Sequence, residues 1–171
     1  MMSINILIRN IGRFVILVLI QVFIFNNIHL TSYGVVPIVY ILYIILLPFE
    51  TPKWLVMILA FFIGISIDIF SDTMGLNAAA SVLIAFIRPG LLNYLAPRDG
   101  YEIGSFPRIY YQGAQWFLKY ATTLVLAHQI TYYMLEAFGF DSFWIILYKI
   151  FIASLISMIL IVISQYTIFR K

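Results

Sequence analysis

Long apolar stretches that are almost free of charge constrain this chain more than any other feature. Of its 171 residues, 64% are hydrophobic and only 10% are charged, whereas soluble domains are about 45–50% apolar and about 25% charged. A soluble fold of this composition would have too few polar side chains to cover its surface, and contact with lipid removes that requirement. We therefore expect an all-α integral membrane protein, since a spanning helix needs about 20 mostly apolar residues.

Polar and helix-breaking residues divide the chain into six candidate transmembrane helices within one membrane domain, residues 1–171. The expected helices cover residues 8–25, 35–47, 54–71, 78–96, 114–138 and 143–169. The second is short for a span, so it is tilted, begins earlier or lies where the bilayer is thinned. No small-residue cleavage site follows the first helix, so we interpret it as a retained span rather than a signal peptide.

The basic residues alternate between the connections of these six helices. If the N-terminus is cytoplasmic, the external turns at 26–34, 72–77 and 139–142 contain no Lys or Arg. The positive-inside rule then predicts a multi-pass protein with both termini in the cytoplasm. A net charge of +3, dispersed along the chain, argues against nucleic-acid binding. The residues on the predicted cytoplasmic side are Arg9, Arg13, Lys53, Arg98, Arg108, Arg170 and Lys171.

Two ionisable residues, Asp68 and Arg88, fall inside the third and fourth predicted helices. A charge in hydrocarbon costs several kcal/mol and usually marks a functional or tightly paired group. Gly64, Asp68 and Ser71 share one face of the third helix, and its small residues let a second helix approach closely. We expect Asp68 and Arg88 to pair, although a rise of about 1.5 Å per residue separates their depths by about 10 Å. Alternatively, the Arg88 side chain extends to the headgroups.

A line of polar residues follows the fifth predicted helix at alternating spacings of four and three. This spacing predicts a single stripe that faces a neighbouring helix or a cavity. It serves either interhelical hydrogen bonding or a polar pocket or partner seam, and Glu136 is placed to meet Lys149 of the sixth helix. The stripe consists of Gln115, Lys119, Thr122, Gln129, Tyr133 and Glu136.

The side chains that enzymes and metal sites use are scarce in this sequence. There is no cysteine, and the two histidines, His29 and His128, stand in no metal-binding or catalytic spacing. We expect no catalytic residue, no metal and no cofactor, and therefore a protein that is not an enzyme.

The third predicted helix ends in the stretch Gly64-Ile-Ser-Ile-Asp-Ile-Phe-Ser71, and Gly75-Leu-Asn-Ala-Ala79 follows it. Together they resemble the central motif of MreD, a family of rod-shape-determining membrane proteins of the bacterial inner membrane. The resemblance implies partnership with the single-pass protein MreC. It also implies membership of the cell-elongation machinery with MreB, RodA and its partner transpeptidase. The MreD fold is thought to be similar to that of the substrate-binding subunits of energy-coupling factor transporters.

These observations predict a non-enzymatic scaffold that binds MreC and helps to direct peptidoglycan synthesis; the alternative is a small-molecule-binding subunit of a membrane transporter. The loop 97–112 is either a solvated loop at the lipid headgroups or a surface for cytoplasmic partners. Membrane lipid is an expected partner in either case. The residues expected at a partner interface or pocket are Gly64, Asp68, Ser71, Gly75, Asn77, Arg88, Gln115, Lys119, Gln129 and Glu136.

Overall fold

The computed structural model describes residues 4–28, 34–102, 104–138 and 143–168, and all regular structure within them is helical. The long helices are α1 (Ile4–Phe23), α3 (Lys53–Ser71), α4 (Leu76–Tyr94), α6 (Ala114–Ala137) and α7 (Phe143–Thr167). The short ones are a 3₁₀ turn, η1 (Phe25–Asn27), and the single turns α2 (Leu42–Ile45) and α5 (Ile109–Gln112). The five long helices agree with five of the predicted segments to within a few residues. The predicted end of the last helix at Phe169, together with Arg170 and Lys171, lies outside the described residues.

Four helical stretches in the described part of the chain are long and apolar enough to cross a membrane. They are Ile8–Asn27, Lys53–Ser71, Leu76–Tyr94 and Phe143–Thr167. The protein is therefore an all-helical chain with several candidate membrane spans. The most polar of the long helices, α6, is not among the four, and it packs between α4 and α7.

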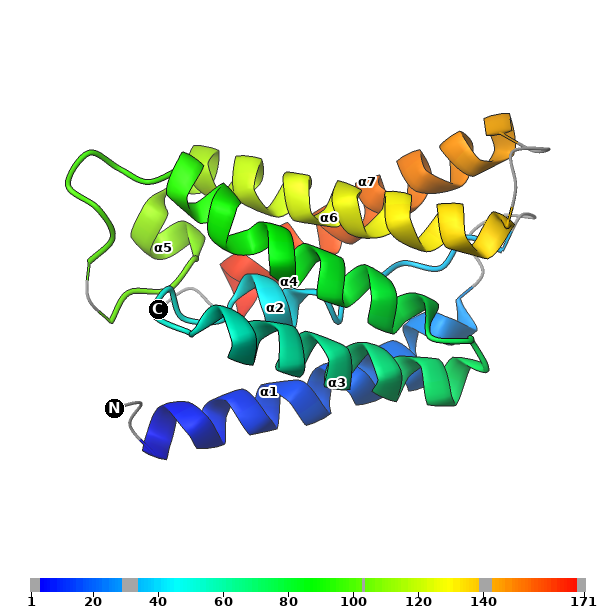
Figure 1. Ribbon diagram of the computed structural model, residues 1–171, viewed down its shortest axis with the longest axis horizontal. Coiled ribbons are helices and arrows are strands. Elements are labelled where there is room, and N and C mark those ends of the chain that lie inside the picture. The colour runs from blue at the N-terminus through cyan, green and yellow to red at the C-terminus, as the bar shows by residue number, and fades with distance from the viewer. Residues whose placement is uncertain (1–3, 29–33, 103, 139–142, 169–171) are drawn as a thin grey trace.

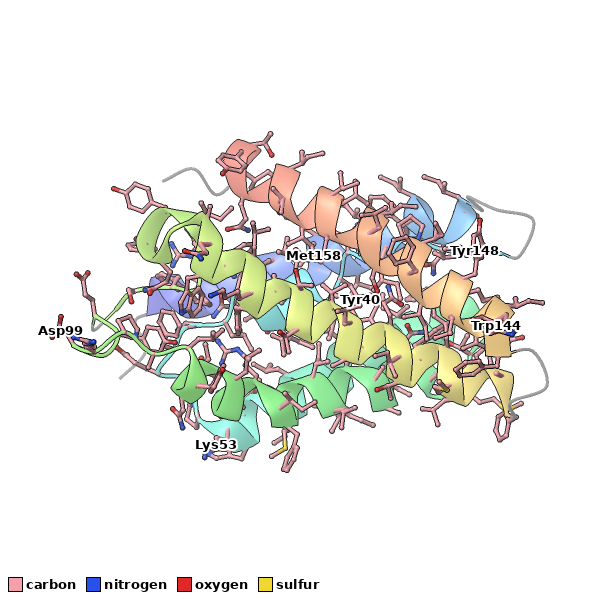
Figure 2. All side chains as sticks on the ribbon, turned by 90° about the horizontal axis from the view of Figure 1, so that it is seen from above. Tyr40, Lys53, Asp99, Trp144, Tyr148 and Met158 are labelled. Carbon is pink, nitrogen blue, oxygen red and sulfur yellow. The ribbon has the colours of Figure 1, made fainter. Side chains whose placement is uncertain are left out.

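The long helices follow one another in space in chain order. Helix α1 packs against α3, α3 against α4, α4 against α6, and α6 against α7 (Figure 1). Helices α1, α3 and α6 run away from the end of the molecule where α5 lies, and α4 and α7 run back toward it, so α1 begins and α7 ends at the same end as α5. We call this the α5 end, and the other the far end. Lys53 and Asp99 both lie toward the α5 end, whereas Trp144 lies at the far end (Figure 2).

The outward faces of the helices are mainly apolar, and many of the polar side chains are buried between the helices. Phe61, Phe62 and Ile69 of α3 are exposed, while Asp68 of the same helix is 2% exposed. Hydroxyl groups on partly exposed faces donate to carbonyls of their own helix four residues earlier, as Ser66 does to Phe62 at 2.7 Å. This arrangement suits lipid, in which outward polar groups have no water to bind.

The predicted second helix, residues 35–47, is wrong. Only the single turn α2 is helical, and residues 34–39 have no regular secondary structure. The segment instead runs through the centre of the bundle, where Tyr40, Ile41 and Leu46 are each 0% exposed. Non-helical backbone is tolerated at membrane depth when protein surrounds it and satisfies its polar groups. We call residues 35–47 the central segment.

Candidate functional site

Side chains from the surrounding helices bind the backbone at the start of the central segment. The Gln21 carbonyl oxygen of α1 accepts from the backbone N–H groups of Val39 (2.8 Å) and Tyr40 (3.3 Å), and its amide donates to the Pro37 carbonyl at 3.0 Å. From α7, the Ser157 hydroxyl accepts from the Ile38 N–H at 2.9 Å. These contacts supply partners that a helix would have provided internally.

Arg88 binds the other end of the central segment. It is 1% exposed, and its guanidinium donates to the Leu47 carbonyl at 2.5 Å and to the Tyr120 hydroxyl at 2.8 Å. Tyr120 in turn donates to the Ile45 carbonyl at 3.1 Å, and Arg13 donates to the Leu46 carbonyl at 3.3 Å. Carbonyls at the end of a helical turn carry partial negative charge, which cations stabilise.

Asp68 caps the N-terminus of α4 from the neighbouring helix α3. One carboxylate oxygen accepts from the Asn77 backbone N–H and side-chain amide, both at 3.0 Å, and from the Thr73 hydroxyl at 2.5 Å. The other accepts from the Ala78 N–H at 2.9 Å. A helix start leaves its first N–H groups without internal partners and favours negative charge, so this arrangement stabilises a buried carboxylate without a salt bridge.

The expected pair of Asp68 and Arg88 does not form. Asp68 accepts a hydrogen bond from the Ala78 N–H. Arg88 lies ten residues further along α4, so it is about 15 Å from Ala78 at a rise of about 1.5 Å per residue. Each charge is instead stabilised by neutral hydrogen-bonding groups near it, with helix-end dipoles taking the place of a counter-ion. Arg88 does not extend to the headgroups either, since its side chain is enclosed.

A hydrogen-bonded cluster connects the α4 cap to α6 through Tyr40. The Tyr40 hydroxyl donates to the Asn77 side-chain oxygen at 3.1 Å, accepts from Ser81 at 3.3 Å, and lies 2.7 Å from the His128 Nε2. The Asn77 side-chain NH₂ group donates to Asp68, so the Asn77 side-chain oxygen is the atom that faces Tyr40. The single proton of the Tyr40 hydroxyl is donated to this oxygen. His128 therefore carries its proton on Nε2 and donates it to Tyr40. Its buried Nδ1 has no hydrogen-bond partner in the described structure.

The small residues of the motif position α3 against the start of α4. A Cβ at Gly64 would lie 2.5 Å from the Ala78 Cα and 2.7 Å from the Asn77 carbonyl oxygen, so a glycine is needed for this close approach. Gly75 adopts a positive φ of 83° in the turn, which suits a glycine. Ser71 accepts a hydrogen bond from Asn26 at 2.7 Å. Five predicted site residues thus meet at one corner: Gly64, Asp68, Ser71, Gly75 and Asn77.

The predicted polar stripe of α6 does not form one buried face. Gln115 and Lys119 are exposed. The buried face is instead offset around the helix and contains mainly aromatic and apolar side chains, with His128 and Gln129 within it. Packing favoured side chains with large apolar surface near the α5 end, and the two polar residues there point outward.

Toward the far end, the stripe behaves more nearly as expected. Gln129 is 0% exposed, and its amide lies 3.5 Å from the Ser157 hydroxyl. Lys149 of α7 meets Glu136 of α6 at 3.0 Å, as the sequence predicted. This pair is partly exposed, so its contribution to stability is small, about 0–1 kcal/mol.

A polar cavity opens above the α4 cap, on the far-end side of the central segment. Its volume is about 370 Å³, and its lining combines amides, hydroxyls and one carboxylate from α1, α3, α4 and α6. Asn77, which binds both Asp68 and Tyr40, is part of this lining, so the cavity borders the hydrogen-bonded cluster. The polar lining residues include Gln21, Asn26, Ser71, Thr73, Asn77 and Glu136.

A second hollow is an apolar groove on the outer surface between α6 and α7, with a volume of about 630 Å³. Leu126 of α6 and Leu155 and Ile159 of α7 line it, and all three are more than a third exposed. Within the groove, the buried Ser154 hydroxyl has no hydrogen-bond partner in the part of the chain that the structure describes. We call this feature the α6/α7 groove.

The loop after α4 is folded onto the α5 end rather than fully solvated. Residues 105–108 are buried, the Gly104 N–H donates to the Glu50 carboxylate at 2.9 Å, and the Tyr101 hydroxyl donates to the Leu92 carbonyl at 2.7 Å. The Tyr101 ring stacks on Phe49 at 4.1 Å, and burial raises the pKa of Tyr101. The loop is therefore packed against the α5 end as part of the fold, and Tyr110 is one of its exposed side chains.

The buried roles of Tyr40, Tyr120 and His128 were not predicted from the sequence. Nothing in their spacing distinguishes them from the many aromatic residues of the chain, and their partners are distant in sequence. The described residues contain no group of three His, Asp or Glu side chains placed to hold a metal. No family model, curated protein or solved structure matches the chain.

Proposed function

We propose that this protein is a non-enzymatic membrane scaffold of the bacterial cell-elongation machinery, in which it binds an MreC-type single-pass partner. The proposal is supported first by the structural use of the motif at the α3/α4 corner, and then by the α6/α7 groove. The motif that resembles MreD forms the corner between α3 and α4, where its carboxylate is fully used in capping a helix. A carboxylate committed to structure in this way favours a scaffold over a reaction centre.

The observation that carries the proposal is the α6/α7 groove. It is apolar, about 630 Å³ in volume and open on the outer surface of the helices, so a transmembrane helix is the partner that its chemistry suits. Association in lipid depends on close packing and on interhelical hydrogen bonds. The buried Ser154 hydroxyl offers such a bond to a helix in the groove. MreB, RodA and its partner transpeptidase would then be reached through this complex.

Filling the groove should prevent this association. We expect Leu155→Trp to lower the amount of MreC-type partner that co-purifies in mild detergent by about tenfold or more, because the indole occupies the space of the partner helix. The matched control is Leu147→Trp, two turns earlier on α7, where an exposed leucine lies outside the groove. Equal recovery of the partner with both variants would contradict the proposal.

The polar cavity supports a second candidate, a small-molecule-binding subunit of a transporter with a fold like the energy-coupling factor substrate-binding subunits. A volume of about 370 Å³ lies within the range of small-ligand sites, about 300–1,000 Å³. Mass spectrometry of the same purified sample separates the two functions. A tightly bound small molecule, recovered at one per chain and lost in Asn77→Leu, would replace the scaffold by this second function.

We also propose that the chain crosses the bacterial inner membrane six times with both ends in the cytoplasm. In this proposal, the central segment and α6 add two crossings to the four apolar helices. The sequence contains no cysteine, so single-cysteine variants can be labelled without background. Asp72→Cys, at the far end, should react with an impermeant maleimide applied outside cells, and Asp99→Cys, at the α5 end, only after permeabilisation. The opposite pattern would overturn this orientation.

A further inference from the structure

A small pocket lies toward the α5 end, where the start of α3 meets the last turns of α4. Its volume is about 240 Å³. The stacked rings of Phe49 and Tyr101 form an aromatic side of it, and Lys53, which marks this end in Figure 2, lies in its lining. The described residues that line the pocket also include Arg88 and Asn93 but no Asp or Glu. We call it the Arg88 pocket.

Arg88 brings a buried positive charge to the pocket, with one guanidinium nitrogen to spare. Among the described residues, its Nε donates to the Tyr120 hydroxyl, and its Nη2 donates to the Leu47 and Pro48 carbonyls. Nη1, which carries two N–H groups, takes no part in these bonds. None of the three acceptors is a carboxylate. An anionic acceptor in the pocket would therefore complete the hydrogen bonding of a guanidinium that is 1% exposed.

The N-terminus of α3 adds a second set of donors to the pocket. The helix begins at Lys53, and Pro52 before it provides no side-chain cap. The first turn contains no acidic residue, although the first N–H groups of a helix have no internal partners and favour negative charge. Lys53 instead places a cation at this end, which the helix dipole disfavours. An anion between Lys53 and Arg88 would offset the costs of both positive charges.

The acidic residue beside the pocket in sequence is used elsewhere. Glu50 accepts from the Gly104 N–H of the loop at 2.9 Å and does not line the pocket. The Thr51 hydroxyl, which does line it, donates its proton to the Pro48 carbonyl at 2.9 Å. The Asn93 amide is exposed and offers a further neutral donor. The pocket thus combines two cations with neutral donors, which is the chemistry of an anion site.

A phosphate group fits these donors better than a flat carboxylate does. Its oxygens point in four directions, and the donors lie on different walls, Lys53 on α3 and both Arg88 and Asn93 on α4. Arginine presents N–H groups that fit phosphate oxygens, and helix N-termini commonly bind phosphate. The volume of about 240 Å³ is below the range of drug-sized ligands, about 300–1,000 Å³, so the pocket suits a phosphate group with little else enclosed.

We propose that the Arg88 pocket binds a phosphate group through Arg88, Lys53 and the N-terminus of α3. The phosphate belongs either to a soluble phosphate ester or to a lipid headgroup, since both present the same oxygens at the end of the helices. Because Arg88 also binds the Leu47 carbonyl, a bound phosphate would fasten α3 and α4 to the central segment. The site shares no lining residue with the α6/α7 groove or the polar cavity, so it is independent of both candidate functions.

Titration with inorganic phosphate tests the site. The full-length protein, in nonionic detergent and phosphate-free buffer, is titrated at constant ionic strength and followed by tryptophan fluorescence. Trp116 reports on the pocket, because its ring contacts those of Phe49 and Tyr101. We expect saturable binding, which Lys53→Gln weakens by about five- to tenfold. Asn93→Phe, which fills the pocket, should weaken binding by about tenfold or more.

Matched variants separate this site from general attraction of anions. Arg98→Gln removes an exposed arginine, and Ala96→Phe adds a ring to an exposed position, both toward the α5 end but outside the lining of the pocket. Both should bind phosphate within about twofold of the unmodified protein. Thermal unfolding without phosphate shows whether each variant is folded. Lys53→Gln is preferred to Arg88→Gln, because loss of Arg88 also releases the end of the central segment.

Competition identifies the source of the phosphate. Glycerol 3-phosphate and phosphatidic acid in mixed micelles are compared as competitors of inorganic phosphate, and tighter binding of either supports the proposal and names the source. Three results would overturn it. No saturable binding of any of these three probes would mean that the pocket holds no phosphate. Equal weakening by Lys53→Gln and Arg98→Gln would mean general electrostatic attraction. Binding of acetate as tight as that of inorganic phosphate would assign the pocket to carboxylates.

Discussion

Asp68→Ala should lower the free energy of unfolding in detergent micelles by about 3–5 kcal/mol, the largest effect expected of a single substitution here. The change leaves the buried N–H groups of Asn77 and Ala78 without acceptors, and it also removes the acceptor of the Thr73 hydroxyl. Each buried donor left unsatisfied costs about 1–3 kcal/mol. Denaturant unfolding followed by tryptophan fluorescence measures the loss, and Asp68→Asn, which keeps the shape but not the charge, should lose less.

Two controls distinguish the α4 cap from other roles of Asp68. Asp72→Asn changes an exposed carboxylate in the same turn and should alter stability by no more than about 0.5 kcal/mol. Because Asp68 and Arg88 bind different partners, the losses in Asp68→Asn and Arg88→Gln should add within about 0.5 kcal/mol. Strong non-additivity would mean that the two charges act as a pair. A loss below about 1 kcal/mol in Asp68→Ala would contradict the capping role.

Gly64→Ala should be the second most damaging change, with a loss of about 2–4 kcal/mol. The added methyl group would lie 2.5 Å from the Ala78 Cα and 2.7 Å from the Ala78 backbone nitrogen. These are backbone atoms, so no side-chain rotation relieves the contact and α3 must move away from α4. Overpacking of this kind costs about 1–3 kcal/mol, and the separation also weakens the Asp68 hydrogen bond to the Ala78 N–H.

Gly90→Ala is the matched control, because it is the same substitution within a helix that packs at this corner. A Cβ at Gly90 meets no heavy atom within 4 Å, so the variant should be as stable as the unmodified protein or more stable by up to about 1 kcal/mol. Thermal unfolding of both variants in one detergent measures the difference. If Gly64→Ala were as stable as Gly90→Ala, the close approach of α3 and α4 would not be essential.

The two candidate functions depend on separate hollows of the molecule. The α6/α7 groove is apolar and suits a partner helix, and the polar cavity suits a small molecule. Because different residues line the two hollows, a variant in one leaves the test of the other intact.

The candidate site was predictable from the sequence where neighbours along the chain make the contacts. The corner of α3 and α4 joins residues 64–78, and the spacing of Gly64, Asp68 and Ser71 was enough to place them on one face. The meeting of Glu136 and Lys149 was predictable for the same reason, since α6 ends and α7 begins only a few residues apart in the sequence. The groups that accept hydrogen bonds from Arg88 were not predictable, because Leu47 and Tyr120 are far from it in sequence.

The sequence by itself determined the helical, apolar character of the chain and the approximate positions of the five long helices, because solvation of apolar side chains and of the backbone acts residue by residue along the chain. Only the tertiary structure decided the path of the central segment. Its residues are apolar enough for a helix, but side chains from α1, α4, α6 and α7 bind its backbone groups, so a non-helical course is stable within the bundle. The partners of Asp68 and Arg88 were decided in the same way, since a buried charge is stabilised by whichever dipoles the packed helices bring to it.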